Sequence, residues 1–289
     1  MEMNRRTAFR TLAALPVAAQ LHAESESRDR FRAGLVAYSY RKQLAAKSMN
    51  YMDLIGKIAD WGLDGLDCTV YWFPDNSTEY LATLRKTAYR NGVQIYNAGV
   101  RVRLSQPTAE LQQAQVEDIK KWIDVADRIG ASQIRVFGGP IPKGASEEQA
   151  VAWAVEVLKR GADYAGSKGI IIAVEDDAGL TITAEPTIEI VKRTASPWVG
   201  INADSGNLKF DGYAKFESLL PYATSVHLKT LVANKDGKYE KADWDRLLGM
   251  IAKSGYKGYV GLEYEGDNAE ADVPRFAGEL RTLVRKMSA

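Results

Sequence analysis

The chain has 289 residues, of which 46% are hydrophobic and 26% charged, so it can bury a sizeable core and is not disordered as a whole. Lys and Arg total 38 and Asp and Glu total 37, and this balance gives no charge excess for nucleic acid or an anionic membrane. A single cysteine and two histidines exclude an internal disulfide and zinc-finger spacing, and they disfavour chemistry that needs several histidines.

The first 23 residues differ from the rest of the chain. Arg5 and Arg6 form a pair, and a short apolar run over Thr11–Ala19 is followed by small residues up to Ala23. This order of charged segment, apolar segment and small residues is typical of a signal peptide, and the run is too short to span a membrane. The paired arginines resemble a bacterial twin-arginine signal, which addresses folded proteins for export. An amphipathic N-terminal helix is the alternative.

We therefore expect a signal peptide over residues 1–23, a linker over 24–32 and a periplasmic location. Cleavage after residue 23 would remove three Arg, one Glu and His22, which leaves a formal charge of −1 and His227 as the only histidine. No other long apolar segment follows, so we expect no membrane association after cleavage.

From residue 33 onward, short apolar runs alternate with stretches of helical periodicity. Several runs are continuously apolar, as is expected of parallel strands that are covered by helices. Helices are expected over Ala109–Ile129, Glu147–Lys168 and Trp244–Lys253, and Gly169, Gly200 and Gly258 are expected to end the preceding segments. The expected strands are Gly34–Tyr38, Gly65–Thr69, Gln94–Ala98, Gln133–Phe137, Ile170–Glu175, Val199–Ala203, Thr224–Leu228 and Tyr259–Glu263.

Eight strands alternating with helices over about 250 residues predict an α/β protein with a single-domain (β/α)8 TIM barrel over residues 33–289. A doubly wound open sheet is the alternative, but neither G-x-G-x-x-G after the first strand nor a P-loop is present. Asn234–Lys238 reads as a turn in the loop after strand seven.

Four consecutive strands end in side chains that can bind metals: Glu175, Asp204, His227 and Glu263. In a barrel the carboxyl ends of the strands carry the chemistry. A single acidic residue at a strand end is more often a helix cap or a solvent-exposed residue than a metal ligand, and a single histidine there more often belongs to the core or the surface. Three carboxylates buried together require a neutralising cation, and three oxygen ligands with one imidazole suit Mn²⁺ or Mg²⁺, with Co²⁺ or Zn²⁺ as further options.

This order of residues resembles the sugar phosphate isomerase/epimerase superfamily of xylose isomerase-like TIM barrels, among which the ketose 3-epimerases are well understood. The resemblance covers roughly residues 33–287 and is supported by four local strings: Trp61–Asp67, Val226–Lys229, Gly255–Tyr259 and Gly261–Tyr264. It implies one divalent ion, commonly Mn²⁺, held by the four residues.

The resemblance also implies a reaction. Glu175 and Glu263 would act as acid and base on opposite faces of a ketose, while Asp204 and His227 mainly hold the ion. One glutamate would remove a proton α to the carbonyl, the metal would stabilise the enediolate, and the other glutamate would return a proton.

Two positions depart from the family pattern. Asp177 and Asn207 stand where members often carry substrate-binding histidines, so the substrate is not expected to be a standard ketohexose bound in the standard way. The run from Glu175 to Asp177 is a polyol-binding segment or a solvated loop, and for Asp176 the solvated loop is favoured.

Further candidates surround this end of the barrel. Lys229 shares a face with His227 and is expected to contact substrate or to pair with a ligand carboxylate. Arg135, inside strand four, needs a carboxylate partner, either Asp67 or Glu175. Cys68 is expected to be a small buried apolar residue. Four aromatic residues follow strands one and two: Tyr38, Tyr40, Trp72 and Phe73. They form either an apolar wall for a sugar ring or part of the ordinary packing, and packing is favoured for Phe73.

The leading hypothesis is thus a metal-dependent isomerase or epimerase of a sugar or sugar-derived ketone. A lyase or dehydratase acting on a keto-inositol or 3-keto-glycoside shares the first proton abstraction. A non-catalytic periplasmic sugar-binding protein would require a two-domain hinge that the sequence does not show. A nuclease of the same barrel superfamily would need several histidines and a basic face. A small carbohydrate is the expected partner, and the sequence leaves homo-oligomerisation open.

Overall fold

The computed structural model describes residues 31–287 of the chain. The predicted signal peptide, residues 1–23, lies outside the described residues, as does most of the expected linker. The described part begins with a strand at Phe31, two residues before the expected start of the barrel domain.

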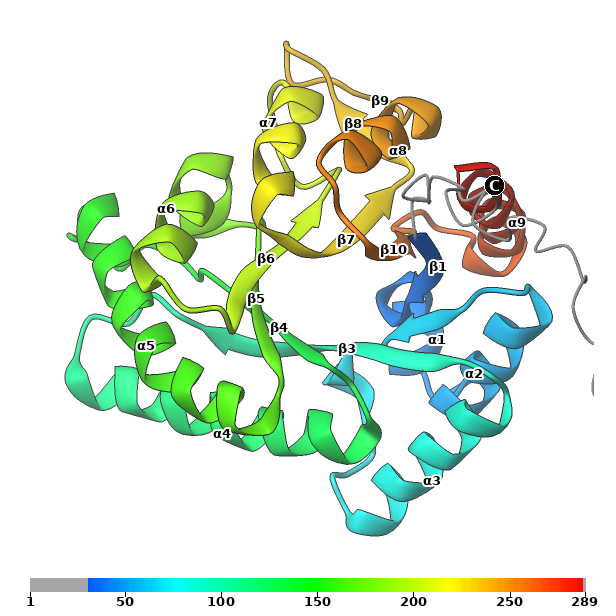
Figure 1. Ribbon diagram of the computed structural model, residues 1–289, viewed down its shortest axis with the longest axis horizontal. Coiled ribbons are helices and arrows are strands. Elements are labelled where there is room, and N and C mark those ends of the chain that lie inside the picture. Colours follow the sequence, from blue (N-terminus) through cyan, green and yellow to red (C-terminus); the bar gives the residue numbers. More distant parts are fainter. Residues whose placement is uncertain (1–30, 288–289) are drawn as a thin grey trace, which may run out of the picture.

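Eight parallel strands form a closed barrel in the order β1-β10-β7-β6-β5-β4-β3-β2 (Figure 1). The predicted (β/α)8 barrel is therefore confirmed, and the open-sheet alternative is wrong. The eight strands are β1 Phe31–Val36, β2 Gly65–Asp67, β3 Gln94–Arg103, β4 Gln133–Phe137, β5 Ile171–Glu175, β6 Val199–Asp204, β7 Ala223–Lys229 and β10 Gly258–Glu263.

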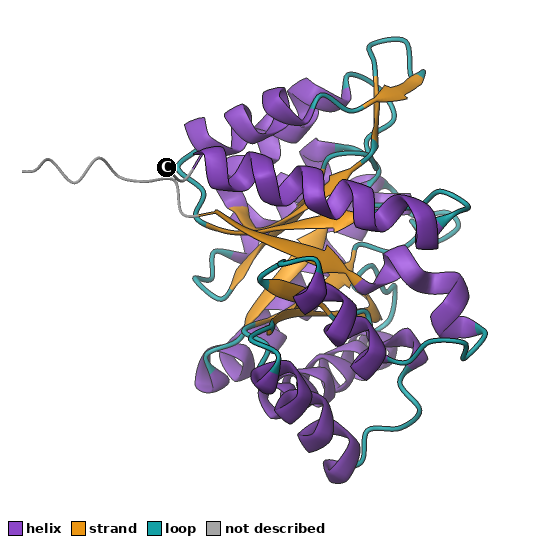
Figure 2. Ribbon diagram, turned by 90° about the vertical axis from the view of Figure 1, so that its right-hand side faces the viewer, coloured by secondary structure: helices purple, strands orange, loops and turns teal. Residues whose placement is uncertain are grey.

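Helices surround the barrel on its outer side (Figure 2). They are α1 Arg41–Ala45, α2 Tyr51–Asp60, α3 Thr78–Arg90, α4 Ala109–Ile129, α5 Glu147–Lys168, α6 Ala184–Thr194, α7 Gly212–Leu219, α8 Trp244–Lys253 and α9 Ala269–Met287. Within residues 31–287, four short 3-10 segments lie at Ala37–Tyr40, Val70–Trp72, Gly179–Thr181 and Leu220–Tyr222. None of the helices in the described residues is both long and apolar enough to cross a membrane.

The bounds of α4, α5 and α8 agree with the sequence prediction because local signals fix both ends. At the start of α5, the Ser146 side chain accepts from the backbone of Gln149 and the Gln149 side chain accepts from the backbone of Ser146, which forms a capping box. At its end, Gly169 adopts a left-handed conformation with φ of 67°. Gly200, by contrast, lies inside β6, so its prediction as a segment end is wrong.

The interior of the barrel is polar along much of its length. Gln133 donates to Ser225 at 2.6 Å, and Ser225 in turn donates to Asn202. Barrel interiors are more often filled by branched apolar side chains. Towards the amino ends of the strands, the rings of Tyr96 and Tyr259 stack with centroids 4.2 Å apart. The space for them exists because Gly65 has no side chain: a Cβ there would lie 2.5 Å from Tyr259.

A small antiparallel hairpin of β8 Leu231–Ala233 and β9 Tyr239–Lys241 lies between β7 and α8, beside α7 (Figure 1). The turn predicted over Asn234–Lys238 connects its two strands and is confirmed: the Asn234 side chain accepts from the backbone of Asp236 and of Lys238. The two short strands on either side of this turn were not expected from the sequence. Cys68 is fully buried, as expected.

Candidate metal centre

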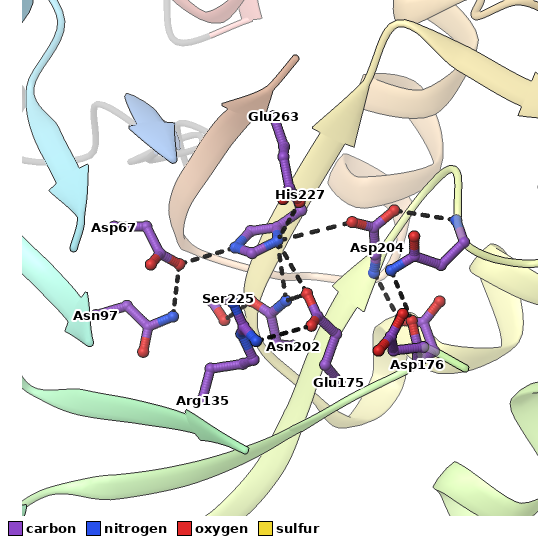
Figure 3. Close-up of polar contacts among 12 residues, drawn as sticks. Asp67, Asn97, Arg135, Glu175, Asp176, Asn202, Asp204, Ser225, His227 and Glu263 are labelled. Carbon is purple, nitrogen blue, oxygen red and sulfur yellow. Dashed lines mark hydrogen bonds and ion pairs between the residues drawn. The ribbon is translucent and has the colours of Figure 1, made fainter. Parts of the chain in front are cut away.

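The four predicted ligands come together at the carboxyl ends of β5, β6, β7 and β10 (Figure 3). One ligand atom from each of Glu175, Asp204, His227 and Glu263 lies within 4.8 Å of the others, and all four residues are buried. Strand register explains the convergence, because Asp204 is paired with His227 across β6 and β7, and the neighbouring strands follow in barrel order. Alternation along each strand then turns these side chains to the interior.

His227 lies at the middle of the cluster, and its two ring nitrogens have different surroundings. Nδ1 lies 3.0 Å from Glu263 Oε2, 3.2 Å from Glu175 Oε1 and 3.7 Å from Asp204 Oδ2. Nε2 lies 2.8 Å from Asp67 Oδ2 on the opposite side. An Nε2–H that donates to Asp67 leaves Nδ1 as the nitrogen that faces the three ligand carboxylates. Metal-bound histidines are commonly oriented in this way by a carboxylate behind the ring.

Asp204 directs only one of its oxygens to the centre. Its Oδ1 accepts from the backbone amides of Gly206 at 2.8 Å and Asn207 at 3.1 Å. Its Oδ2 is buried and makes no hydrogen bond within the described residues, and the same holds for Glu263 Oε2. Two buried carboxylate oxygens without a hydrogen-bond donor are costly unless a cation is shared between them, and the Lys229 ammonium stays beyond hydrogen-bond distance of both, at 3.6 Å and 3.7 Å. This donor set therefore fits a hard divalent cation such as Mn²⁺ or Mg²⁺.

The charges of the centre shift the pKa values of its members. Burial favours the neutral imidazole, but the charge of Glu263 and the close contacts with Asp204, Asp67 and Glu175 raise the pKa of His227 well above its ordinary value. Burial raises the pKa of Asp204 to about 6, against the opposing charge of Lys229. Burial also opposes ionisation of Glu263, but the charges of Lys229 and His227 outweigh it and lower its pKa.

Arg135 is paired with Glu175, one of the two partners that the sequence suggested. Its guanidinium lies 3.2 Å from Glu175 Oε2 and donates to the hydroxyl of Tyr71 at 3.1 Å. Burial disfavours the charge, but the carboxylate of Glu175 raises the pKa of Arg135 above its ordinary value. The other oxygen, Glu175 Oε1, accepts from Asn202 at 3.1 Å and faces the centre. Glu175 is therefore held from both sides.

Asp176 is fully buried, so its prediction as a solvated loop residue is wrong. Its carboxylate accepts from the backbone amide of Asp204 at 2.7 Å, and this explains why it is buried: the amide needs an acceptor. Burial and the neighbouring charge of Asp204 raise the pKa of Asp176 well above its ordinary value. Its backbone carbonyl accepts from Asn207 at 2.9 Å.

Lys229 is buried and surrounded by carboxylates. Its ammonium lies 3.0 Å from Glu265, 3.6 Å from Asp204 and 3.7 Å from Glu263, and it donates to Asn207 at 3.0 Å. Burial opposes its charge, but Asp204 and Glu263 raise its pKa well above the ordinary value. Of the two predicted roles, pairing with a ligand carboxylate is present in the structure. Both ends of the Asn207 side chain are used within the protein.

The aromatic residues after strands one and two divide into two groups. Tyr38 and Trp72 are half-buried, with ring centroids 5.9 Å apart, and so form a common surface. Tyr40 is fully buried, so of the two alternatives left open for this residue packing is the one that the structure shows. Phe73 packs edge-on against Tyr51, which agrees with the packing role favoured for it. Asp177 is half-buried and lines a separate cavity of about 440 Å³ with Arg101 and Arg103.

The residues that lie behind the ligands were not predicted from the sequence. Asp67 was considered only as a partner for Arg135, yet it contacts His227 and accepts from Asn97 at 2.6 Å. Asp67 is the last residue of β2, but the strand was expected to run to Thr69, so Asp67 did not stand at its expected end as the ligands did. Asn97 and Asn202 lie inside strands and gave no comparable signal.

Comparison with solved structures gives several matches over nearly the whole chain. D-psicose 3-epimerase from Clostridium cellulolyticum H10, solved with D-tagatose, is 16% identical with a TM-score of 0.72 over 89% of this chain and 99% of that one. The probable 3-DHS dehydratase AsbF from Bacillus anthracis is 16% identical, with a TM-score of 0.69 over 87% and 98%. The 3-keto-D-glucoside 4-epimerase YcjR from E. coli is 14% identical, with a TM-score of 0.70 over 88% and 100%.

At such identities the matches establish a shared fold. No curated protein sequence matches this chain significantly. The family model described as xylose isomerase-like TIM barrel matches residues 55–285, which is most of the chain. The resemblance noted in the sequence is thereby confirmed, and the protein belongs to the xylose isomerase-like TIM barrel family.

Proposed function

We propose that this protein is a divalent-metal-dependent isomerase or epimerase that moves a proton α to the carbonyl of a sugar or sugar-derived ketone. The observation that carries the proposal is the convergence of Glu175, Asp204, His227 and Glu263 at the carboxyl ends of adjacent barrel strands. The family and its structural neighbours are mostly enzymes, and the sugar epimerases among them make this reaction class the first to test.

In this proposal Asp204 and His227 mainly hold the ion, and Glu175 and Glu263 carry the proton. One glutamate takes the proton from the carbon between them, and the other returns a proton to that carbon. When bound, the cation supplies the positive charge that stabilises the enediolate oxygens. Arg135 keeps Glu175 in one orientation through its contact with Oε2. Lys229 lies beside Glu263 and supplies further positive charge there.

Mn²⁺ is the proposed ion, with Mg²⁺, Co²⁺ and Zn²⁺ as alternatives, because the donor set has three carboxylates and one imidazole. We expect about one tightly bound divalent ion per chain, measured by elemental analysis after gel filtration. His227→Asn and Glu175→Gln should lose it, whereas Glu156→Gln, an exposed glutamate on α5, should retain it. The proposal would be refuted if the wild-type protein contained no metal and its activity were unaffected by EDTA.

The reaction is tested in D₂O with a panel of ketoses and keto-glycosides. An isomerase or epimerase should place solvent deuterium on the carbon next to the carbonyl, and Glu175→Gln and Glu263→Gln should each reduce this exchange. Glu156→Gln again serves as the matched control. Binding of a sugar without any exchange would favour the non-catalytic sugar-binding alternative instead.

A metal-dependent lyase is the second candidate, because loss of a β leaving group can follow removal of the same proton. One observation supports the lyase reaction: a cavity of about 620 Å³ extends from Glu263 and Lys229 and offers room for a leaving group. Release of an aglycone or water from the substrate, in place of a deuterated isomer, would identify this reaction.

We also propose that the chain is exported to the periplasm through its twin arginines, Arg5 and Arg6. Sugars outside the cytoplasm are mostly unphosphorylated, so this location favours a neutral glycan or glycoside as the substrate.

A further inference from the structure

The cavity beside Glu263 leads from the candidate metal centre to the β8–β9 hairpin. At one end it is lined by Glu263, Lys229 and Asn207, and at the other by Leu231, Tyr239 and Phe276. Its polar end thus belongs to the centre, whereas its far end combines these apolar side chains with the charged Lys241 and Arg275. Its volume of about 620 Å³ lies within the range that binding sites for small molecules commonly show.

The apolar side chains at the hairpin are unusually exposed for this protein. Leu231 is 50% exposed and Tyr239 is 46% exposed. Phe210 is 55% exposed and lies against the hairpin turn, where a Cβ on Gly237 would approach it to 2.6 Å. These are three of the six large hydrophobic residues that are exposed in residues 31–287. Exposed apolar groups gathered beside a cavity are typical of a binding surface.

The hairpin holds these groups in a defined orientation. Leu231 pairs with Lys241 and Ala233 pairs with Tyr239, so these four side chains share one face of the hairpin. Three of them, Leu231, Tyr239 and Lys241, line the cavity. Glu240 lies on the other face and accepts from the Asn234 side chain at 2.8 Å, which fastens the turn. The hairpin face that carries Leu231 and Tyr239 therefore borders the space that adjoins the centre, with Lys241 beside them.

We propose that this cavity binds a second part of the substrate, a ring attached to the sugar ketone, whose apolar face packs against Tyr239 and Leu231. This inference rests on the proposed function and narrows its substrate class to ketones with a ring substituent, such as keto-glycosides. The ring is either an aromatic aglycone or a second sugar, since both present an apolar face to a tyrosine. A free ketohexose has no group to fill this end of the cavity.

The test compares three ligands on the purified chain with Mn²⁺ added: methyl 3-keto-β-glucoside, phenyl 3-keto-β-glucoside and 3-keto-cellobiose. Calorimetry should show that the phenyl ligand, the disaccharide or both bind about tenfold more tightly than the methyl ligand. A gain in affinity of this size is expected from one aromatic packing contact. Which of the two gains affinity identifies the ring. Tyr239→Ala should remove the gain without changing the affinity for the methyl ligand, and Tyr239→Phe should preserve it.

Leu231→Ser provides a second variant in case Tyr239→Ala disturbs the hairpin. Tyr89→Ala is the matched control, because Tyr89 is 85% exposed and lies near the amino ends of the strands, where it lines another cavity with Arg32 and Gln94. Equal affinities for the three ligands, or no binding of the two larger ones, would overturn the proposal. So would a change of particle mass in Tyr239→Ala without an effect on ligands, since that would make the hairpin an interface between copies.

Deuterium exchange separates this proposal from the reaction proposed above. If the larger ligands bind preferentially but none of the three exchanges in D₂O, the reaction is rejected and the binding site is retained. If the methyl ligand exchanges and no preference for a ring is found, the reaction is retained and the ring site is rejected.

Discussion

Asp67→Asn is expected to weaken metal binding although Asp67 is not one of the four candidate ligands. Its carboxylate lies 2.8 Å from His227 Nε2, and both side chains are fully buried. The substitution keeps the shape of the side chain and an acceptor for Asn97, but it removes the negative charge behind the imidazole. A hydrogen bond to a charged group contributes about 1.5–3 kcal/mol. Loss of most of that energy corresponds to an affinity about 10- to 100-fold lower.

The assay is a Mn²⁺ titration in the presence of a competing chelator, with thermal unfolding of the metal-free protein as a check on the fold. Asp163→Asn is the matched control, because Asp163 is exposed on α5 and makes no ion pair within the described residues. The ring can also be observed directly by nitrogen NMR, because His227 is the only histidine in residues 31–287. Its Nε2 should carry the proton in the metal-loaded protein.

The reasoning is refuted if folded Asp67→Asn binds Mn²⁺ within twofold of the wild type. In that case the imidazole would not depend on Asp67 for its orientation or its basicity. A proton on Nδ1 in the metal-loaded wild-type protein would also refute the reasoning, since that nitrogen would then be unavailable to the ion.

Three further predictions concern protons, packing and export. The pKa of His227 is raised well above its ordinary value and that of Asp204 is about 6 in the metal-free fold, so protons compete with Mn²⁺ for His227 from neutral pH downward and for Asp204 as well below pH 6. Mn²⁺ affinity should then drop by about tenfold per pH unit above pH 6 and more steeply below it, and a flat profile from pH 7 to 5 in the same titration would contradict this. Gly65→Ala should lower stability by about 1–3 kcal/mol, because its methyl group would lie 2.5 Å from Tyr259. A melting temperature unchanged by Gly65→Ala would show that the two rings can move aside. The double substitution Arg5→Lys and Arg6→Lys should retain the protein in the cytoplasm of a host with a twin-arginine pathway, and fractionation that still finds it in the periplasm would reject this route.

Helix bounds could be predicted closely where the end signals are local, as for α5 with its capping box and Gly169. Strand lengths were less predictable because they depend on the neighbouring strand. β3 runs five residues beyond the expected Ala98, as far as Arg103, which pairs with Phe137 after a register shift. The hairpin after β7 was recognised only by its turn, since a three-residue strand carries almost no periodic signal.

For the centre, strand order and side-chain alternation were enough to bring the four ligands to one place. The polar residues around them could not be assigned because their roles depend on partners far away in the sequence. Asp176 is an example. It lies in a run of three acidic residues, which is typical of a solvated loop, yet its carboxylate is the buried acceptor of the backbone amide of Asp204. Asp67 is separated from His227 by 160 positions, and only the closed barrel places them in contact.

The polar interior of the barrel has a consequence for how this protein can change. Gln133, Ser225 and Asn202 form a hydrogen-bonded series that reaches the ligand Glu175, so replacing one member leaves another buried group unsatisfied. New specificity gained by mutating the interior would therefore be accompanied by a loss of stability. The β8–β9 hairpin is joined to the barrel by short connections and has exposed side chains, so it can vary without that loss. Diversification of substrates among close relatives should accordingly be concentrated in the hairpin and the other loops at the mouth, around an interior that stays the same.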